Sequence, residues 1–155
     1  MRQPRQAVRV AVLDPSGAIF LFRYDNEEVG VHWAMPGGGV GEGETLLQAA
    51  RRELLEETGW DDIEPGPQLW TWGHDFTHNG QPVHQFERIL LGYGPRRDPL
   101  GDLSAAHAQD RILRWQWLSP ARLQDCPEAL WPPQLPELLG RLLHEGAPAS
   151  PMSLD

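Results

Sequence analysis

Cysteine is nearly absent from this sequence, because Cys126 is the only one in 155 residues. No disulfide within the chain is therefore possible, and nothing points to an oxidising compartment. The sequence also lacks any run of about 18 or more apolar residues, which argues against a membrane-spanning helix. Residues 1–6 are basic but lead directly into an apolar stretch, without the core or cleavage site of a signal peptide. We therefore expect a cytoplasmic protein that has no membrane partner.

Positive charge is scarce as well. Thirteen lysine and arginine residues stand against 22 aspartate and glutamate residues, which gives a formal net charge of −9. Such a surface repels the phosphate backbone of nucleic acids, so a nucleic-acid polymer is not expected as a partner. Small phosphorylated substrates remain compatible with this charge, because bound divalent cations can reverse the field in an acidic site.

Length and composition favour one folded domain. Hydrophobic residues make up 40% of the chain and seven of the residues are tryptophan, so the chain can bury a core. No internal repeat or linker divides the sequence. We expect a single domain over residues 1–145, followed by a flexible tail over residues 146–155. A homodimer is compatible with the sequence.

The order of the predicted elements indicates an α+β fold. Apolar stretches at residues 7–13 and 18–24 flank turn residues and predict a hairpin. Residues 70–76 alternate in polarity, and an Asn-Gly pair joins them to a partner strand at residues 83–93. Residues 94–109 are polar and rich in glycine, proline and aspartate, which predicts a long loop.

The C-terminal third adds one strand and one helix. Residues 112–118 are expected to form a strand. The leucines in residues 135–143 have the spacing of an amphipathic helix that closes the domain. The whole pattern predicts a mixed sheet that packs against helices.

The strongest helix signal covers residues 45–58. Thr45 is a suitable N-cap and Gly59 stands where a C-cap glycine belongs. The stripe expected to face the core consists of Leu47, Ala50 and Leu54. Five glycines within residues 37–43 precede this helix, and we expect them to form a loop that adopts unusual dihedral angles or approaches a ligand.

Three carboxylates share one face of this predicted helix. Glu53, Glu56 and Glu57 fall within an arc of roughly 100°, and Glu44 lies just before the helix. Taken alone, such a cluster is more often a solvated acidic face. Next to a glycine-rich loop, however, these hard oxygen ligands suit Mg²⁺ or Mn²⁺, which in turn bind phosphate oxygens.

The spacing of these residues resembles the signature of the Nudix family. That signature is G-x5-E-x7-R-E-U-x-E-E-x-G-U, where U is a bulky apolar residue, and it is matched from Gly38 to Trp60. Trp60 stands where an aliphatic residue is commoner. The resemblance implies an α/β/α sandwich with a mixed central sheet. It also implies metal-dependent hydrolysis of a diphosphate linkage in a small nucleotide-like substrate.

The resemblance also implies a role for each residue of the motif. Glu56 and Glu57 would be metal ligands, and Glu53 would be a further ligand or the base that deprotonates the attacking water. Arg52 would orient Glu53 through a charge-assisted hydrogen bond, or pair with Glu56 on the helix surface. Glu44 would support the metal site. A backbone carbonyl near Gly37 and Gly38 would complete the coordination.

A carboxylate further along the chain often joins the site in this family. Asp110 is the favoured candidate, because it directly precedes the strand predicted at residues 112–118. The alternatives are Asp98, Asp102 and Glu87, and each of the four has plain surface charge as its other interpretation.

Aromatic residues are candidates to stack on a nucleobase, although core packing is the commoner role for such residues. The proposed substrate-binding residues are Trp72, Phe76 and Phe86. His74, His78 and His84 lack cysteine partners, and we interpret them as hydrogen-bonded or solvent-facing residues rather than as a zinc site.

The substrate is only partly constrained by the sequence. No tyrosine occupies the offset of dinucleoside polyphosphate hydrolases, and the proline offset of ADP-ribose hydrolases is unmatched. A nucleoside di- or triphosphate pyrophosphohydrolase is therefore favoured. Hydrolysis of ADP-ribose, a nucleoside-diphosphate sugar, coenzyme A or a dinucleoside polyphosphate is the alternative. A non-catalytic nucleotide-binding sensor is a different class, and the retention of every carboxylate of the motif argues against it.

Overall fold

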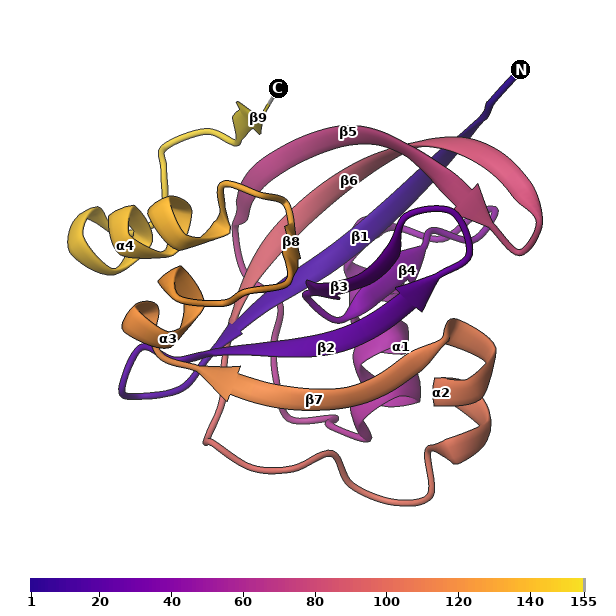
Figure 1. Cartoon of the computed structure of the whole chain (residues 1–155). Coiled ribbons are helices and arrows are strands. Elements are labelled where there is room, and N and C mark those ends of the chain that lie inside the picture. Colours follow the sequence, from indigo (N-terminus) through magenta and orange to yellow (C-terminus); the bar gives the residue numbers. More distant parts are fainter. Residues whose placement is uncertain (155) are drawn as a thin grey trace.

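The structure is a computed structural model that describes residues 1–154 (Figure 1). The strands are β1 (Gln3–Leu13), β2 (Ile19–Asn26), β3 (Gly30–Ala34), β4 (Gly37–Gly39), β5 (Gln68–His78), β6 (Gln81–Tyr93), β7 (Ile112–Leu118), β8 (Ala129–Trp131) and β9 (Met152–Leu154). The helices are α1 (Leu46–Thr58), α2 (Ser104–Asp110), α3 (Pro120–Gln124) and α4 (Leu135–Glu145).

The sheet is mixed, as the sequence predicts. Its strand order is β8-β3-β2-β1-β6-β5-β9, with β4 paired to β1 and β7 paired to β2. The central pair is parallel and runs from Gln3 opposite Val83 to Leu13 opposite Tyr93. Both predicted hairpins form, with antiparallel pairing of β1 with β2 and of β5 with β6. Asn79 and Gly80 have φ values of 49° and 79°, as a tight two-residue hairpin turn requires.

Helices cover both faces of the sheet. Val8 and Val10 of β1 belong to a buried cluster that includes Leu54 of α1. Leu13 belongs to the opposite cluster, which includes Leu139 of α4. Figure 1 shows α1 on one side of the strands and α3 with α4 on the other. The expected α/β/α sandwich within an α+β fold is therefore confirmed.

Some local predictions were wrong. Part of the long loop expected at residues 94–109 is helical, because α2 begins at Ser104. Leu47 was expected in the core but is 36% exposed, and Ala49 is buried instead. Residues 104–110 contain no large apolar residue, so the sequence offers no apolar stripe that would predict this helix, and none of its residues is buried.

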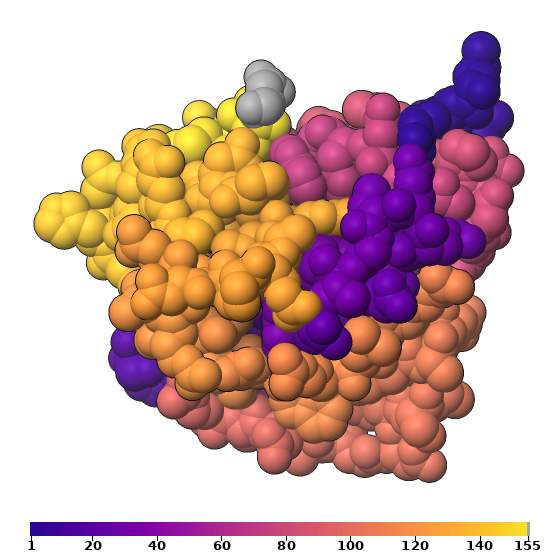
Figure 2. All heavy atoms as spheres, viewed as in Figure 1, coloured from indigo at the N-terminus to yellow at the C-terminus, as the bar shows by residue number. Residues whose placement is uncertain are grey.

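The C-terminal segment differs from the flexible tail expected over residues 146–155. Met152–Leu154 form β9, which pairs in parallel with β5, and Leu154 is buried. Residue 155 lies outside the described residues. Figure 2 shows the C-terminal part of the chain, in orange to yellow, packed closely against the segments in purple and magenta. Within residues 1–154, no helix has the length and apolar character needed to span a membrane.

Candidate active site

Helix α1 begins and ends where the sequence predicts. The Thr45 hydroxyl accepts a hydrogen bond from the Gln48 amide at 3.1 Å, and the Gln48 side chain accepts one from the Thr45 amide at 2.9 Å. This capping box satisfies two amides at the helix N-terminus. At the other end, Gly59 adopts a left-handed conformation with φ of 74°. These caps fix where the helix that carries the carboxylates begins and ends.

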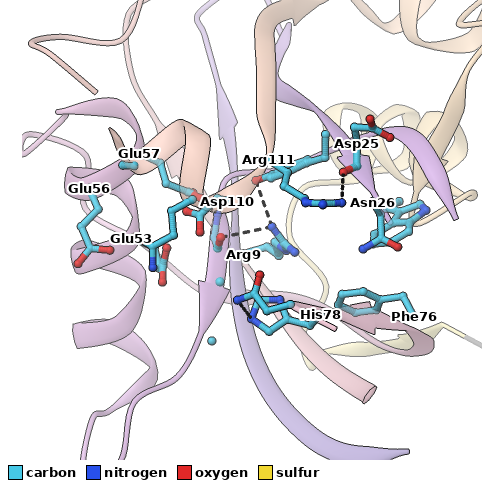
Figure 3. A pocket seen from close by; sticks show the side chains of 18 of the residues that line it. Arg9, Asp25, Asn26, Glu53, Glu56, Glu57, Phe76, His78, Asp110 and Arg111 are labelled. Atoms are coloured by element: carbon cyan, nitrogen blue, oxygen red, sulfur yellow. Dashed lines mark hydrogen bonds between the residues drawn. The ribbon is translucent and has the colours of Figure 1, made fainter. Parts of the chain in front are cut away.

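Three carboxylates from two elements come together. Oxygen atoms of Glu53, Glu57 and Asp110 lie within 4.8 Å of one another. Glu53 and Glu57 project from α1 and are only 7% and 1% exposed, whereas Asp110 ends α2 and is exposed. We call these three residues the carboxylate cluster. In Figure 3 they gather on one side of Arg9.

The carboxylate cluster has the chemistry of a cation site. Burial raises the pKa of Glu57 well above its usual range, and the nearby charges of Glu53 and Asp110 raise it further. The Glu57 Oε1 atom accepts a hydrogen bond from the Gly37 amide at 2.8 Å. Its Oε2 atom is buried and has no hydrogen-bond partner within the described part of the chain. Because an unpaired buried carboxylate oxygen is costly, this atom fits a divalent cation that prefers oxygen ligands.

Arg52 ties the helix to the segment that precedes it. Its Nε and Nη2 atoms donate to the two carboxylate oxygens of Glu44 at 2.7 and 3.0 Å, and Nη2 also donates to the Gly39 carbonyl oxygen at 2.9 Å. Nη1 donates to Glu53 Oε1 at 2.9 Å and to Glu56 Oε2 at 3.3 Å. Both sequence interpretations of Arg52 therefore hold in the structure. Hydrogen bonds from Arg52 and from the Gly41 amide lower the pKa of Glu44 to about 2.

Glu56 is placed differently from the other two acids of α1. Its side chain is 52% exposed, and it lies outside the set of oxygens that Glu53, Glu57 and Asp110 bring together. Glu56 still lines the same cavity, next to Arg52. Its carboxylate thus faces the opening of the site rather than its buried end.

The glycine-rich segment is partly a strand, which corrects the expected loop. Residues 37–39 form β4, and Gly37 pairs with Arg9 of β1. The expected close approach does occur, because a Cβ on Gly38 would lie 2.7–2.9 Å from the Glu53 carboxylate atoms. A Cβ on Gly37 would lie 2.1 Å from the Val8 carbonyl oxygen. Lack of space therefore requires glycine at position 37, where the clash is with backbone, whereas at position 38 the Glu53 side chain would have to move.

A cavity of about 550 Å³ adjoins the carboxylate cluster. Towards the end away from the cluster it is lined by aromatic side chains and by polar groups of β2. Phe76 and Asn26 lie on the opposite side of Arg9 from the cluster in Figure 3. The Trp131 ring stacks on His32 with centroids 3.5 Å apart. Burial lowers the pKa of His32 to about 4, so this ring is neutral near pH 7. The cavity thus combines an anionic end with an aromatic end.

Comparison with known proteins identifies the family. The chain matches the family model described as NUDIX domain over residues 3–141. It belongs to the Nudix family. An RNA pyrophosphohydrolase of Erythrobacter litoralis is 31% identical over 136 residues, which cover 77% of this chain and 78% of the relative. An RNA pyrophosphohydrolase of Wolbachia pipientis is 43% identical over 72 residues, which cover 46% of this chain and only 43% of the relative.

Solved structures agree with the fold of this Nudix domain. The MutT protein from Methanosarcina mazei Go1 superposes with a TM-score of 0.65 at 20% identity, covering 93% of this chain and 96% of that protein. The dihydroneopterin triphosphate pyrophosphohydrolase of E. coli gives a TM-score of 0.64 at 18% identity, covering 88% and 96%. At these identities the likeness supports the fold alone.

The alternatives to Asp110 have other partners in this Nudix domain. Glu87 is buried, and its carboxylate lies 3.3 Å from Arg9 Nε and 2.8 Å from His74 Nε2. The Asp98 carboxylate accepts a hydrogen bond from Trp115 at 3.3 Å. Asp102 accepts bonds from the amide and hydroxyl of Ser104, at the start of α2. Among the four candidates, only Asp110 joins the carboxylate cluster.

Of the three aromatic residues proposed to bind the substrate, only one lines the cavity. Phe76 lines the cavity. Trp72 is placed elsewhere, since it packs against the core and stacks on His74 with centroids 3.7 Å apart. Phe86 lies on the other face of β6, beneath the guanidinium of Arg88. The interpretation of His84 as a hydrogen-bonded residue agrees with its 2.7 Å contact to Asp75.

Sequence reasoning missed several residues that line the cavity, namely Arg5, Arg9, His32, Arg111 and Trp131. Arg9 carried a usable signal, since it is a lone charge within an apolar stretch that forms a strand. A buried arginine needs a buried partner, so its presence there indicated a paired charge. Trp131 carried no comparable signal, because its place depends on the pairing of β8 with β3.

Replacing Gly38 by alanine should lower kcat by about 10- to 100-fold, because small displacements of reacting groups are expensive in catalysis. The added Cβ would push the Glu53 carboxylate away from its place in the carboxylate cluster. Steady-state kinetics check this result. Gly140→Ala is the matched control, since a Cβ there meets nothing within 4 Å and the residue is helical. Wild-type kcat in Gly38→Ala would show that the close approach of Gly38 to the Glu53 carboxylate does not contribute to catalysis.

Proposed function

We propose that this chain is a metal-dependent pyrophosphohydrolase that cleaves a diphosphate linkage in a nucleoside di- or triphosphate. The observation that carries the proposal is the carboxylate cluster, in which buried Glu57 Oε2 lacks a partner among the described residues. The cluster opens onto a cavity large enough for a nucleotide-sized ligand. The Nudix family assignment supports the same activity.

The proposed roles follow from position. Glu57 and Asp110 would hold the cation, Mg²⁺ or Mn²⁺, and Glu56 would be a further ligand. The cation, when bound, neutralises the diphosphate and raises the fraction of hydroxide at the attacking water. Glu53 either takes the proton of that water or binds the cation. Burial raises the pKa of Glu53, which favours its action as a base.

Other residues of the chain position these groups and the substrate. Arg52 and Glu44 hold the carboxylate of Glu53 in place through the hydrogen bonds described above. The Gly38 carbonyl would complete the coordination. Phe76 and Trp131 line the aromatic end of the cavity, where a nucleobase would bind against them.

The 5′ end of an RNA is a second candidate substrate. Both relatives described above are named RNA pyrophosphohydrolase. This name runs against the expectation that the acidic chain has no nucleic-acid polymer as a partner, an expectation based on a net charge of −9. Parallel assays with a nucleoside triphosphate and with a 5′-triphosphorylated RNA of the same first base separate the two. A ratio of kcat/KM above about 10 identifies the preferred substrate.

Removal of divalent metal should abolish hydrolysis. We expect release of phosphate or pyrophosphate from nucleoside triphosphates to require millimolar Mg²⁺ or Mn²⁺, because such ions are held weakly and remain partly hydrated. Excess EDTA should stop the reaction, and added metal should restore it. Full turnover in EDTA would contradict the metal-dependent mechanism. Tight nucleotide binding without any turnover at saturating metal would instead favour the nucleotide-binding sensor.

A further inference from the structure

The cavity contains an arginine side chain, that of Arg5, which forms no ion pair among the described residues. Arg5 projects from β1 into the cavity, and its side chain is partly buried. The Nη2 atom of Arg5 would lie 2.8 Å from a Cβ on Gly39, so the glycine leaves room for the guanidinium. Glu53 and Asp110 are near enough to influence the pKa of Arg5 electrostatically. Arg5 and the carboxylate cluster therefore line the same cavity.

The partner of Arg5 is uncharged. Arg5 Nη1 donates a hydrogen bond to the Oε1 atom of Gln85, which is fully buried. The Nε2 atom of the same Gln85 amide donates to Glu87 Oε2 at 2.8 Å. Because Glu87 accepts the amide hydrogen, the Gln85 oxygen must face Arg5. Gln85 thus fixes the guanidinium without cancelling its charge.

The other arginines near the cluster differ in this respect. Arg9 pairs with Glu87 at 3.3 Å, and Arg52 pairs with Glu44 at 2.7 Å. Within residues 1–154, no carboxylate oxygen lies within 4.0 Å of a guanidinium nitrogen of Arg5. Burial lowers the pKa of Arg5 and the charge of Arg9 lowers it further, and the opposing effects of Glu53, Glu87 and Asp110 do not fully offset them. A bound anion would relieve both penalties.

We propose that Arg5, held by Gln85, forms a phosphate subsite that selects triphosphates over diphosphates. The subsite binds a phosphate group that the cation at the carboxylate cluster does not hold. A guanidinium suits this role, because it is always charged and its donors match two phosphate oxygens. This inference rests on the proposed function, since it assumes that the cluster takes a diphosphate and leaves one further phosphate in a triphosphate.

Equilibrium binding of non-hydrolysable ligands tests the subsite without requiring turnover. The probes are adenosine tri- and diphosphate analogues with methylene bridges in place of every anhydride oxygen, titrated in Mg²⁺ by calorimetry. Arg5→Gln should weaken binding of the triphosphate analogue by about 10-fold or more, as expected for a lost charge-assisted contact. Binding of the diphosphate analogue should change by less than about 3-fold. Gln85→Glu should produce the same selective loss, because it gives Arg5 a charged partner.

Arg88→Gln removes a cation from the outer face of β6 and should leave both affinities unchanged. Equal losses for both analogues in Arg5→Gln, or no loss for either, would overturn the proposal. If Gln85→Glu fails to fold, Arg5→Lys replaces it and should recover part of the triphosphate affinity. If the wild-type chain binds both analogues but hydrolyses no nucleotide, the proposed function is wrong, whereas the phosphate subsite is still supported by the binding data.

Discussion

Replacing Glu57 by Gln should lower kcat at least about 100-fold, equivalent to about 2.7 kcal/mol of transition-state stabilisation, while the fold stays intact. Glutamine keeps the shape of the side chain and can still accept the hydrogen bond from the Gly37 amide. It removes the anionic oxygen that the cation would bind. Steady-state kinetics at saturating metal, together with thermal unfolding, measure the two effects.

Unfolding without metal adds a second expected result for Glu57→Gln. The pKa of buried Glu57 is raised in the folded state, so its charge destabilises the fold at a pH above the unfolded value. The wild type should therefore gain stability as the pH falls towards that value, and Glu57→Gln should lack this gain. The variant should unfold at an equal or higher temperature than the wild type near pH 7.

Two further substitutions show whether a loss of kcat in Glu57→Gln is specific to that position. Glu64→Gln removes an exposed acid that pairs with Arg51, and it should leave kcat unchanged. Glu56→Gln should chiefly raise the metal concentration that is needed, because Glu56 is half-exposed and lies outside the carboxylate cluster. Wild-type turnover in Glu57→Gln would refute its assignment as a ligand. Joint loss of stability and activity would indicate a structural role.

Helix α1 was predictable because the residues that define its ends and its faces lie close together in the sequence. Thr45 and Gly59 mark its ends, and a regular helix then fixes which side chains share a face. The family resemblance assigned Arg52 a contact with Glu53, and the i, i+4 spacing assigned it one with Glu56; both contacts occur. Asp110 was found because it directly precedes a strand that was itself predictable.

The features that the sequence did not predict include contacts between segments that are distant in the sequence. The parallel register of β1 and β6 brings Arg9 close to Glu87, and no local pattern specifies that register. The orientation of α1 relative to the sheet buries Ala49 and leaves Leu47 partly exposed, although both lie near the apolar stripe. The helix α2 has no buried residue, so it lacked the periodic apolar signal by which helices are recognised.

Replacing Glu87 by Gln should destabilise the folded protein by about 3 kcal/mol near pH 7, because removing one partner of a buried ion pair leaves the other charge uncompensated. Arg9 and Glu87 are 7% and 2% exposed, so solvent screens this pair little. Burial alone would raise the pKa of Glu87, but the charge of Arg9 and hydrogen bonds from His74 and Gln85 outweigh it and lower the pKa to about 2. Urea unfolding at several pH values measures the effect.

The pH dependence of this loss follows from the lowered pKa. The stabilisation by Glu87 should be fully present above the unfolded value near 4.5 and should be lost as the pH falls towards about 2. The stability difference between wild type and Glu87→Gln should shrink over that range. Asp110→Asn is the contrasting variant, because Asp110 is exposed and belongs to the carboxylate cluster. It should preserve stability but lower kcat or raise the metal requirement. If Asp110→Asn changed neither of these while Glu87→Gln changed the metal requirement, Glu87 would be the ligand and the assignment of Asp110 would be wrong.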